Sequence, residues 1–135
     1  MFTDTLYYLT ISPDGMRNIF TTGTRAEPEM SQKVYSVDKK AEIWGEPKEV
    51  KALSNLGAGY FQIMKNNKVY FFAQQPREGI YFTQPNDTGE YVTPMWLSDK
   101  VSLENSSTFD ILMHEDEYKL LVSHYYVVEQ YLNRG

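Results

Sequence analysis

The densest group of side chains with chemical potential lies near the carboxyl end of the chain, where Asp110 is followed by the run His114-Glu115-Asp116-Glu117. Carboxylate oxygens are the ligands that Ca²⁺ prefers, so the composition suits a calcium site. The run lacks the alternating spacing and the glycine of a twelve-residue calcium loop. We therefore interpret it as a solvated turn, and we predict no metal site and no cofactor.

Other patterns that carry catalysis are also missing from the sequence. His114 and His124 stand ten residues apart, and without any cysteine they do not make a zinc site. Ser12 lies in a turn sequence, and no Gly-x-Ser-x-Gly motif occurs. The glycine-rich segment 56–60 (LGAGY) lacks the Lys-Ser/Thr ending of a phosphate loop. We predict no catalytic residue and a protein that is not an enzyme.

The element that must position any site is a β-hairpin over residues 6–22 (LYYLTISPDGMRNIFTT). In its centre, Pro13 fixes φ, Asp14 bonds its own backbone and Gly15 supplies positive φ, so the segment reverses tightly. The flanking runs of aromatic, aliphatic and β-branched residues are typical of strands.

Two later segments, 60–72 and 108–123, repeat this strand-turn-strand pattern. With the turns marked at Gly15, Asn67 and Asp116, the offsets are 52 and 49 residues. Between the hairpins, residues 33–37 and 79–83 predict a third strand, followed by turns at 38–40 and 86–89 and short fourth strands at 42–47 and 90–94. Four strands in a period near fifty are typical of a propeller blade. Residues 118–131 also allow a helical interpretation.

The first period resembles the repeat of TolB-like, WD-repeat-like propellers, in which an aromatic residue and Ser-Pro-Asp-Gly open each blade. Ser12 to Gly15, Arg25, Val34-Tyr35, Trp44 and Pro47 occupy the positions of that repeat. The resemblance implies an all-β fold with blades at about 5–49, 58–97 and 107–135, the last incomplete. It also implies export to the periplasm or the exterior, although the chain begins without the features of a signal peptide, so the compartment stays open.

About three blades are fewer than the four to eight of a closed propeller. We expect a homodimer in which two arcs close a six-bladed ring. The alternative is a fragment of a larger exported protein. A second alternative is a propeller enzyme or lectin whose pocket forms only in the closed ring, with Asp110 and Gln62 converging on its axis.

Blade geometry would place the loops between second and third strands on the face that commonly binds ligands. That face would carry Arg25, Arg77, Glu78 and Trp96, and Arg and Trp are typical binding anchors. The structural alternative is that the arginines pair with neighbouring acids and Trp96 covers a seam. We predict a non-catalytic module that binds a protein, peptide or glycan. The net charge of -5 disfavours nucleic acid, and no apolar run is long enough for membrane insertion.

Overall fold

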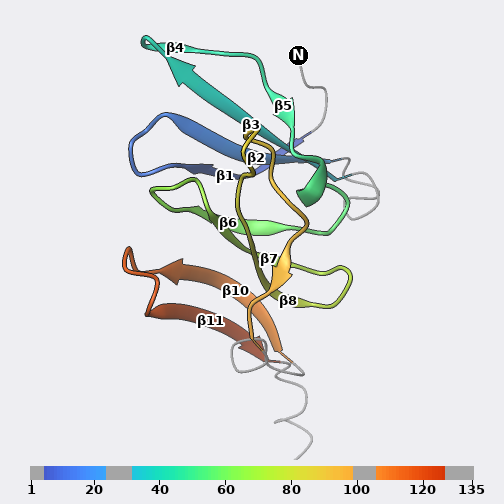
Figure 1. The fold of residues 1–135 in the computed structure, drawn as a ribbon. Helices are drawn as coiled ribbons and strands as arrows, with labels where there is room; N and C mark the ends of the chain where they lie inside the picture. Colours follow the sequence, from blue (N-terminus) through green and yellow to red (C-terminus); the bar gives the residue numbers. More distant parts are fainter. Residues whose placement is uncertain (1–4, 24–31, 99–105, 127–135) are drawn as a thin grey trace, which may run out of the picture.

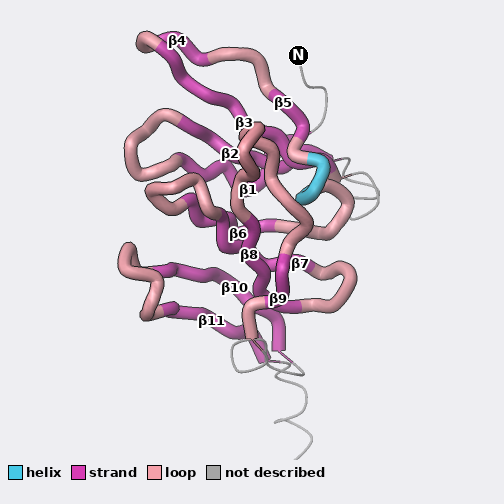
Figure 2. The backbone as a smooth tube through the Cα atoms, in the orientation of Figure 1, coloured by secondary structure: helices cyan, strands magenta, loops and turns pink. Residues whose placement is uncertain are grey.

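The computed structural model describes residues 5–23, 32–98 and 106–126 (Figure 1). These residues form antiparallel β-sheets joined by turns and one short 3-10 helix, η1 (Lys51–Leu53), with no α-helix among them (Figure 2). The predicted all-β class is confirmed. In the same part of the chain, no helix has the length and apolar character needed to cross a membrane.

The first sheet, sheet 1, has the order β1-β2-β3-β4, and β5 also pairs with β3. Its strands are β1 (Thr5–Ile11), β2 (Arg17–Gly23), β3 (Lys33–Lys40), β4 (Ile43–Trp44) and β5 (Lys48–Glu49). The predicted hairpin around Pro13-Asp14-Gly15 joins β1 and β2. The turn predicted at 38–40 is wrong by position, because β3 continues to Lys40 and the chain reverses at Ala41 and Glu42. Both of these residues have positive φ, 50° and 66°, as a tight two-residue hairpin requires.

The second sheet, sheet 2, has the order β6-β7-β8-β9. Its strands are β6 (Gly59–Ile63), β7 (Val69–Ala73), β8 (Gly79–Thr83) and β9 (Met95–Trp96). The strand predicted at 79–83 is confirmed, but the fourth strand predicted at 90–94 is wrong. Tyr91 makes only an isolated bridge to Pro85, and β9 pairs with β8 instead. Pro94 has no N–H for a sheet ladder, which explains why regular pairing begins only after it.

The third sheet, sheet 3, consists of β10 (Ser106–Met113) and β11 (Leu120–Tyr126) in the part of the chain that the structure describes. A helix over 118–131 is therefore wrong as far as residue 126, and the last five residues of that range lie outside the described residues.

Sheet 2 lies between the other two, and its first strand β6 contacts both β1 and β10 (Figure 1). Every residue of β7 is buried, because alternate side chains of this strand enter two different cores. Phe71 belongs to the core between sheets 1 and 2, and Tyr70 belongs to the core between sheets 2 and 3.

The three hairpin turns share one geometry although their sequences differ. In each, a backbone N–H closes the turn onto a carbonyl three residues earlier, from Gly15 to Ser12, from Asn67 to Met64 and from Glu117 to His114, over 2.8–2.9 Å. The donors all have positive φ, between 62° and 74°. The residue equivalent to Gly15 is thus Glu117, which corrects the sequence alignment at Asp116 by one position. Asp116 instead accepts the backbone N–H of Tyr118, as Asp14 does from Met16.

Candidate functional site

The end of sheet 2 opposite its hairpin turn carries three of the four predicted binding residues. Arg77 and Glu78 lie in the loop between β7 and β8, and Trp96 lies in β9. Figure 1 shows this loop at the same end of the molecule as the segment that leads into β6. Arg25 lies outside the described residues. The site is therefore built from the loop ends of sheet 2.

Arg77 and Trp96 lie directly against each other. The guanidinium carbon of Arg77 is 4.4 Å from the centroid of the Trp96 ring, which is the geometry of a cation–π contact. Tyr81 holds both partners, because its ring meets Trp96 edge-on, with centroids 5.3 Å apart. Its hydroxyl donates to the Arg77 carbonyl over 2.6 Å and accepts the Arg77 N–H over 3.2 Å. The buried side chain of Tyr81 thus holds the backbone of the loop at Arg77 in place.

Trp96 also has a structural contact. Its half-buried side chain packs against the core between sheets 1 and 2, next to Tyr81. Trp96 therefore contacts the core between the two sheets, and the guanidinium of Arg77 lies over its ring. Trp96 thus packs against this core, and its role as a binding anchor stays a prediction.

Glu78, the neighbour of Arg77 in the sequence, borders a small cleft with a volume of about 190 Å³, and neither Arg77 nor Trp96 lines it. The other side chains around the cleft include two tyrosines from adjacent first strands, Tyr8 and Tyr60, together with Gln74. The two phenol rings are 4.9 Å apart and tilted by 57°. Aromatic rings beside a carboxylate and an amide can bind a sugar ring, an amide or a basic side chain.

The backbone around the cleft is strained at the two tyrosines. Tyr8 and Tyr60 have φ of 53° and 54°, a region that non-glycine residues rarely adopt. Gly59 permits the close approach of Tyr8, because a Cβ there would lie 2.7 Å from the Tyr8 ring. Strained residues of this kind often mark functional sites. Sequence reasoning missed Tyr8, Gly59 and Tyr60, although the equal place of the two tyrosines in the first two periods was a usable signal.

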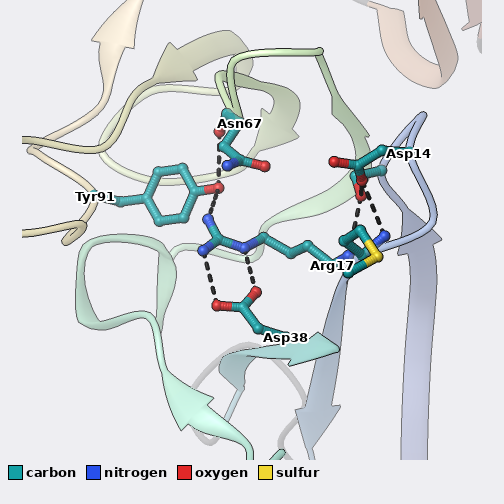
Figure 3. Close-up of polar contacts among 7 residues, drawn as sticks. Asp14, Arg17, Asp38, Asn67 and Tyr91 are labelled. Atoms are coloured by element: carbon teal, nitrogen blue, oxygen red, sulfur yellow. Dashed lines mark hydrogen bonds and ion pairs between the residues drawn. The ribbon is translucent and has the colours of Figure 1, made fainter. Parts of the chain in front are cut away.

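The opposite end of the same interface holds a polar network that joins sheets 1 and 2 (Figure 3). Arg17 of β2 forms a bidentate ion pair with Asp38 of β3, with N···O distances of 2.6 and 3.0 Å. Its third nitrogen donates to the hydroxyl of Tyr91 over 3.1 Å, and that hydroxyl donates to the Asn67 carbonyl over 2.7 Å. Figure 3 also shows Asp14, whose carboxylate stays within the first hairpin turn.

The electrostatics of this network are those of a stable ion pair. The hydrogen bonds from Arg17 lower the pKa of Asp38 below its ordinary value. The same ion pair raises the pKa of Arg17. Burial raises the pKa of Tyr91, so its phenol stays protonated and donates. These groups therefore keep their charges and protons near neutral pH. We interpret the network as a structural contact between sheets 1 and 2.

A related network joins sheets 2 and 3. Glu117 accepts the hydroxyl of Tyr70 over 2.7 Å and pairs with Lys68 over 3.0 Å. The hydrogen bond from Tyr70, followed by that from Lys68, lowers the pKa of Glu117. The Lys68 ammonium also lies over the rings of Tyr70 and Phe82. Part of the acidic run is thus a contact between sheets rather than a fully solvated turn.

The remaining residues singled out from the sequence take structural roles or lie outside the description. His114 pairs with Asp116 within its own turn. Gln62 bonds the backbone of Met113 in the next sheet. The side chains of Asp110 and His124 are not among those described. No group of three or more potential metal ligands occurs within the described ranges.

Comparison with known proteins adds no relative to this picture. Family models, curated proteins and solved structures all gave no match to the chain.

Proposed function

We propose that the protein is a non-catalytic interaction module that binds a protein, peptide or glycan partner at the loop end of its sheets. The observation that carries this proposal is the contact of Arg77 with Trp96 at the loop end of sheet 2. The cleft that Glu78 borders is a second feature of the same loop. Arg77 and Glu78 lie in the loop that joins β7 and β8, two of the most deeply buried strands in the described part of the chain, and Trp96 lies in β9, which pairs with β8. A rigid scaffold that presents loop residues is the usual arrangement of a binding surface.

We further propose that the three sheets are blades of a TolB-like propeller arc. Two features support this: the first strands β1, β6 and β10 lie in succession, and the three hairpin turns are geometrically equivalent. Three blades do not close a ring. A second copy would bring the number to about six, within the range of closed propellers.

A titration followed by nuclear magnetic resonance tests the binding proposal. The ¹⁵N-labelled chain is titrated with a panel of short peptides of varied charge and with a panel of oligosaccharides. We expect at least one ligand to shift the amide signals of residues 57–60, 74–81 and 95–97 together. An Arg77→Ala variant should weaken that ligand at least tenfold.

The matched control is Lys65→Ala, an exposed residue of the hairpin turn at the opposite end of sheet 2. This variant should bind as the unmodified chain does. Shifts confined to the hairpin-turn end, or equal losses in both variants, would contradict the proposed binding face. No shift with any ligand of either panel would contradict the proposed ligand classes.

A further inference from the structure

We infer that the outer face of sheet 3 binds the outer face of sheet 1 of a second copy, head to tail. The inference rests on the propeller-like arrangement proposed above and specifies which surfaces complete it. It comes from three observations on the first strands of the sheets and on the side chains that they leave uncovered.

The outer face of sheet 1 is apolar at its first strand. Leu9 and Ile11 have 67% and 56% of their surface exposed. Thr10, between them, points the other way, because its hydroxyl donates to the Phe61 carbonyl of β6 over 3.0 Å. The two aliphatic side chains therefore belong to the side of β1 that faces away from sheet 2.

The outer face of sheet 3 is apolar as well. Leu112 and Leu121 are paired across β10 and β11, and 59% and 68% of their surfaces are exposed. Their neighbours Ile111 and Met113 point the other way into the core against sheet 2. Paired apolar side chains of this size on one face of a sheet mark a surface that another molecule covers.

The contacts between successive first strands, from β1 to β6 and from β6 to β10, indicate how β10 would contact a following sheet. Two residues before each hairpin turn, Thr10 and Gln62 reach across to the backbone of the next first strand. Leu112 has the same place in β10 and points towards the place of a fourth sheet. In the chain, the side chain of Thr10 bonds the side of β6 that faces sheet 1. The equivalent side of β1 faces away from sheet 2, and among the described faces it is the one left free to contact Leu112 in the same way.

The occupant that fits is therefore a second copy of this chain. Such a contact is heterologous, because one partner contributes sheet 3 and the other contributes sheet 1. Two copies form a closed ring when sheet 3 of each copy contacts sheet 1 of the other. In this arrangement Leu112 of one copy lies near Leu9 and Ile11 of its partner. Burial of four exposed aliphatic side chains per contact favours association.

Cysteine cross-linking tests the inference directly, because the chain contains no cysteine. An Ile11→Cys protein and a Leu112→Cys protein, carrying tags of different size, are mixed and oxidised. We expect the mixed disulfide as the main product, at least tenfold over either symmetric disulfide. A Lys65→Cys protein serves as the control and should give only the background product with either partner.

Symmetric disulfides in excess would overturn the inference in favour of faces that pair with themselves. No cross-link above the control would also overturn it, and the two faces would then be covered by another part of the chain or by a different protein. Light scattering supplies a second measurement: a mass near twice 15.7 kDa is expected, and Leu112→Asp should shift it to the monomer.

The titration of the loop end separates the two proposals. A chain that fails to cross-link but still binds a ligand near Arg77 loses only the head-to-tail contact. A chain that cross-links but binds nothing keeps the contact and loses the proposed binding function.

Discussion

The two interfaces between the sheets occupy equivalent places but are built from different side chains. Between sheets 1 and 2, Phe61, Phe71 and Tyr81 form a continuous series of rings, with centroids 5.9 and 6.0 Å apart. Between sheets 2 and 3, the core has a pair of rings, Tyr70 and Phe82, and it includes two methionines, Met64 and Met113. Methionine is unbranched and adapts to irregular space, whereas packed rings have fixed shapes. The first interface is therefore the more sharply specified of the two.

The polar contacts show the same difference. Arg17 grips Asp38 through two nitrogens, while Lys68 offers Glu117 a single ammonium group. A guanidinium matches a carboxylate in two directions at once, and an ammonium does not. The ion pair between Arg17 and Asp38 therefore fixes the relative orientation of its two side chains, whereas the pair between Lys68 and Glu117 allows several orientations.

The largest expected effect comes from the cores. Phe71→Ala should lower the free energy of unfolding by about 3–5 kcal/mol, because it removes a buried ring and leaves a cavity. Met113→Ala should cost less, about 2–3 kcal/mol, because flexible neighbours can close part of the space. Urea denaturation followed by circular dichroism measures both. Equal losses, or the reverse order, would contradict the difference between the two interfaces.

The ion pairs should differ in the same sense. Asp38→Asn should destabilise the protein by about 1–3 kcal/mol, because it leaves the half-buried guanidinium of Arg17 without its charged partner. Glu117→Gln should cost about 1 kcal/mol or less, because the amide oxygen can still accept the hydroxyl of Tyr70 and only the charge pair with Lys68 is lost. Glu42→Gln is the control, since 90% of the Glu42 side chain is exposed beside Lys39; it should change stability by under about 0.5 kcal/mol. A larger loss for Glu117→Gln than for Asp38→Asn would reverse the ranking.

Acid should reveal the same contacts in the unmodified protein. The folded state lowers the pKa of Asp38 and of Glu117 below their ordinary values of 3.8 and 4.5. Their stabilisation is therefore complete above those values and is lost as the pH falls through the lowered pKa of each group. Denaturation midpoints measured between pH 6 and pH 2 should decline below about pH 4. The decline should be flatter in Asp38→Asn, and an unchanged profile would contradict the role of the pair.

The smallest effect on stability is expected at the cleft. Gly59→Ala should displace the Tyr8 ring, and the ring can turn aside, so the loss should be about 1 kcal/mol or less. The signals of Tyr8 and Tyr60 should nevertheless move, and ligand binding near Glu78 should weaken. Gly45→Ala is the control, because a Cβ there would meet the Asp38 carbonyl at 3.4 Å, an ordinary contact. Unmoved tyrosine signals would contradict the close approach at Gly59.

Local chemistry was enough to predict most of the strands and most of the turns. Pro13-Asp14-Gly15 fixed the first hairpin, and the run at 79–83 gave a strand with correct bounds. The short strand β9 was missed, because two residues carry no alternation that a pattern can detect. The pair of Arg17 with Asp38 depends on strand register, and the approach of Tyr8 to Gly59 depends on packing between sheets. Neither is encoded in the spacing of residues along the chain.

The complete burial of β7 has a consequence during synthesis of the protein. Its sequence Val-Tyr-Phe-Phe-Ala is uncharged and rich in β-forming residues, the composition of segments that aggregate when exposed. Sheet 1 leaves the ribosome before β7, but sheet 3 begins only at Ser106, 33 residues after the end of β7 at Ala73. During that interval the side of β7 that carries Tyr70 lacks the core residues from sheet 3, Ile111 and Met113. β7, which is fully buried in the folded protein, is therefore exposed to aggregation on one side until sheet 3 has been synthesised.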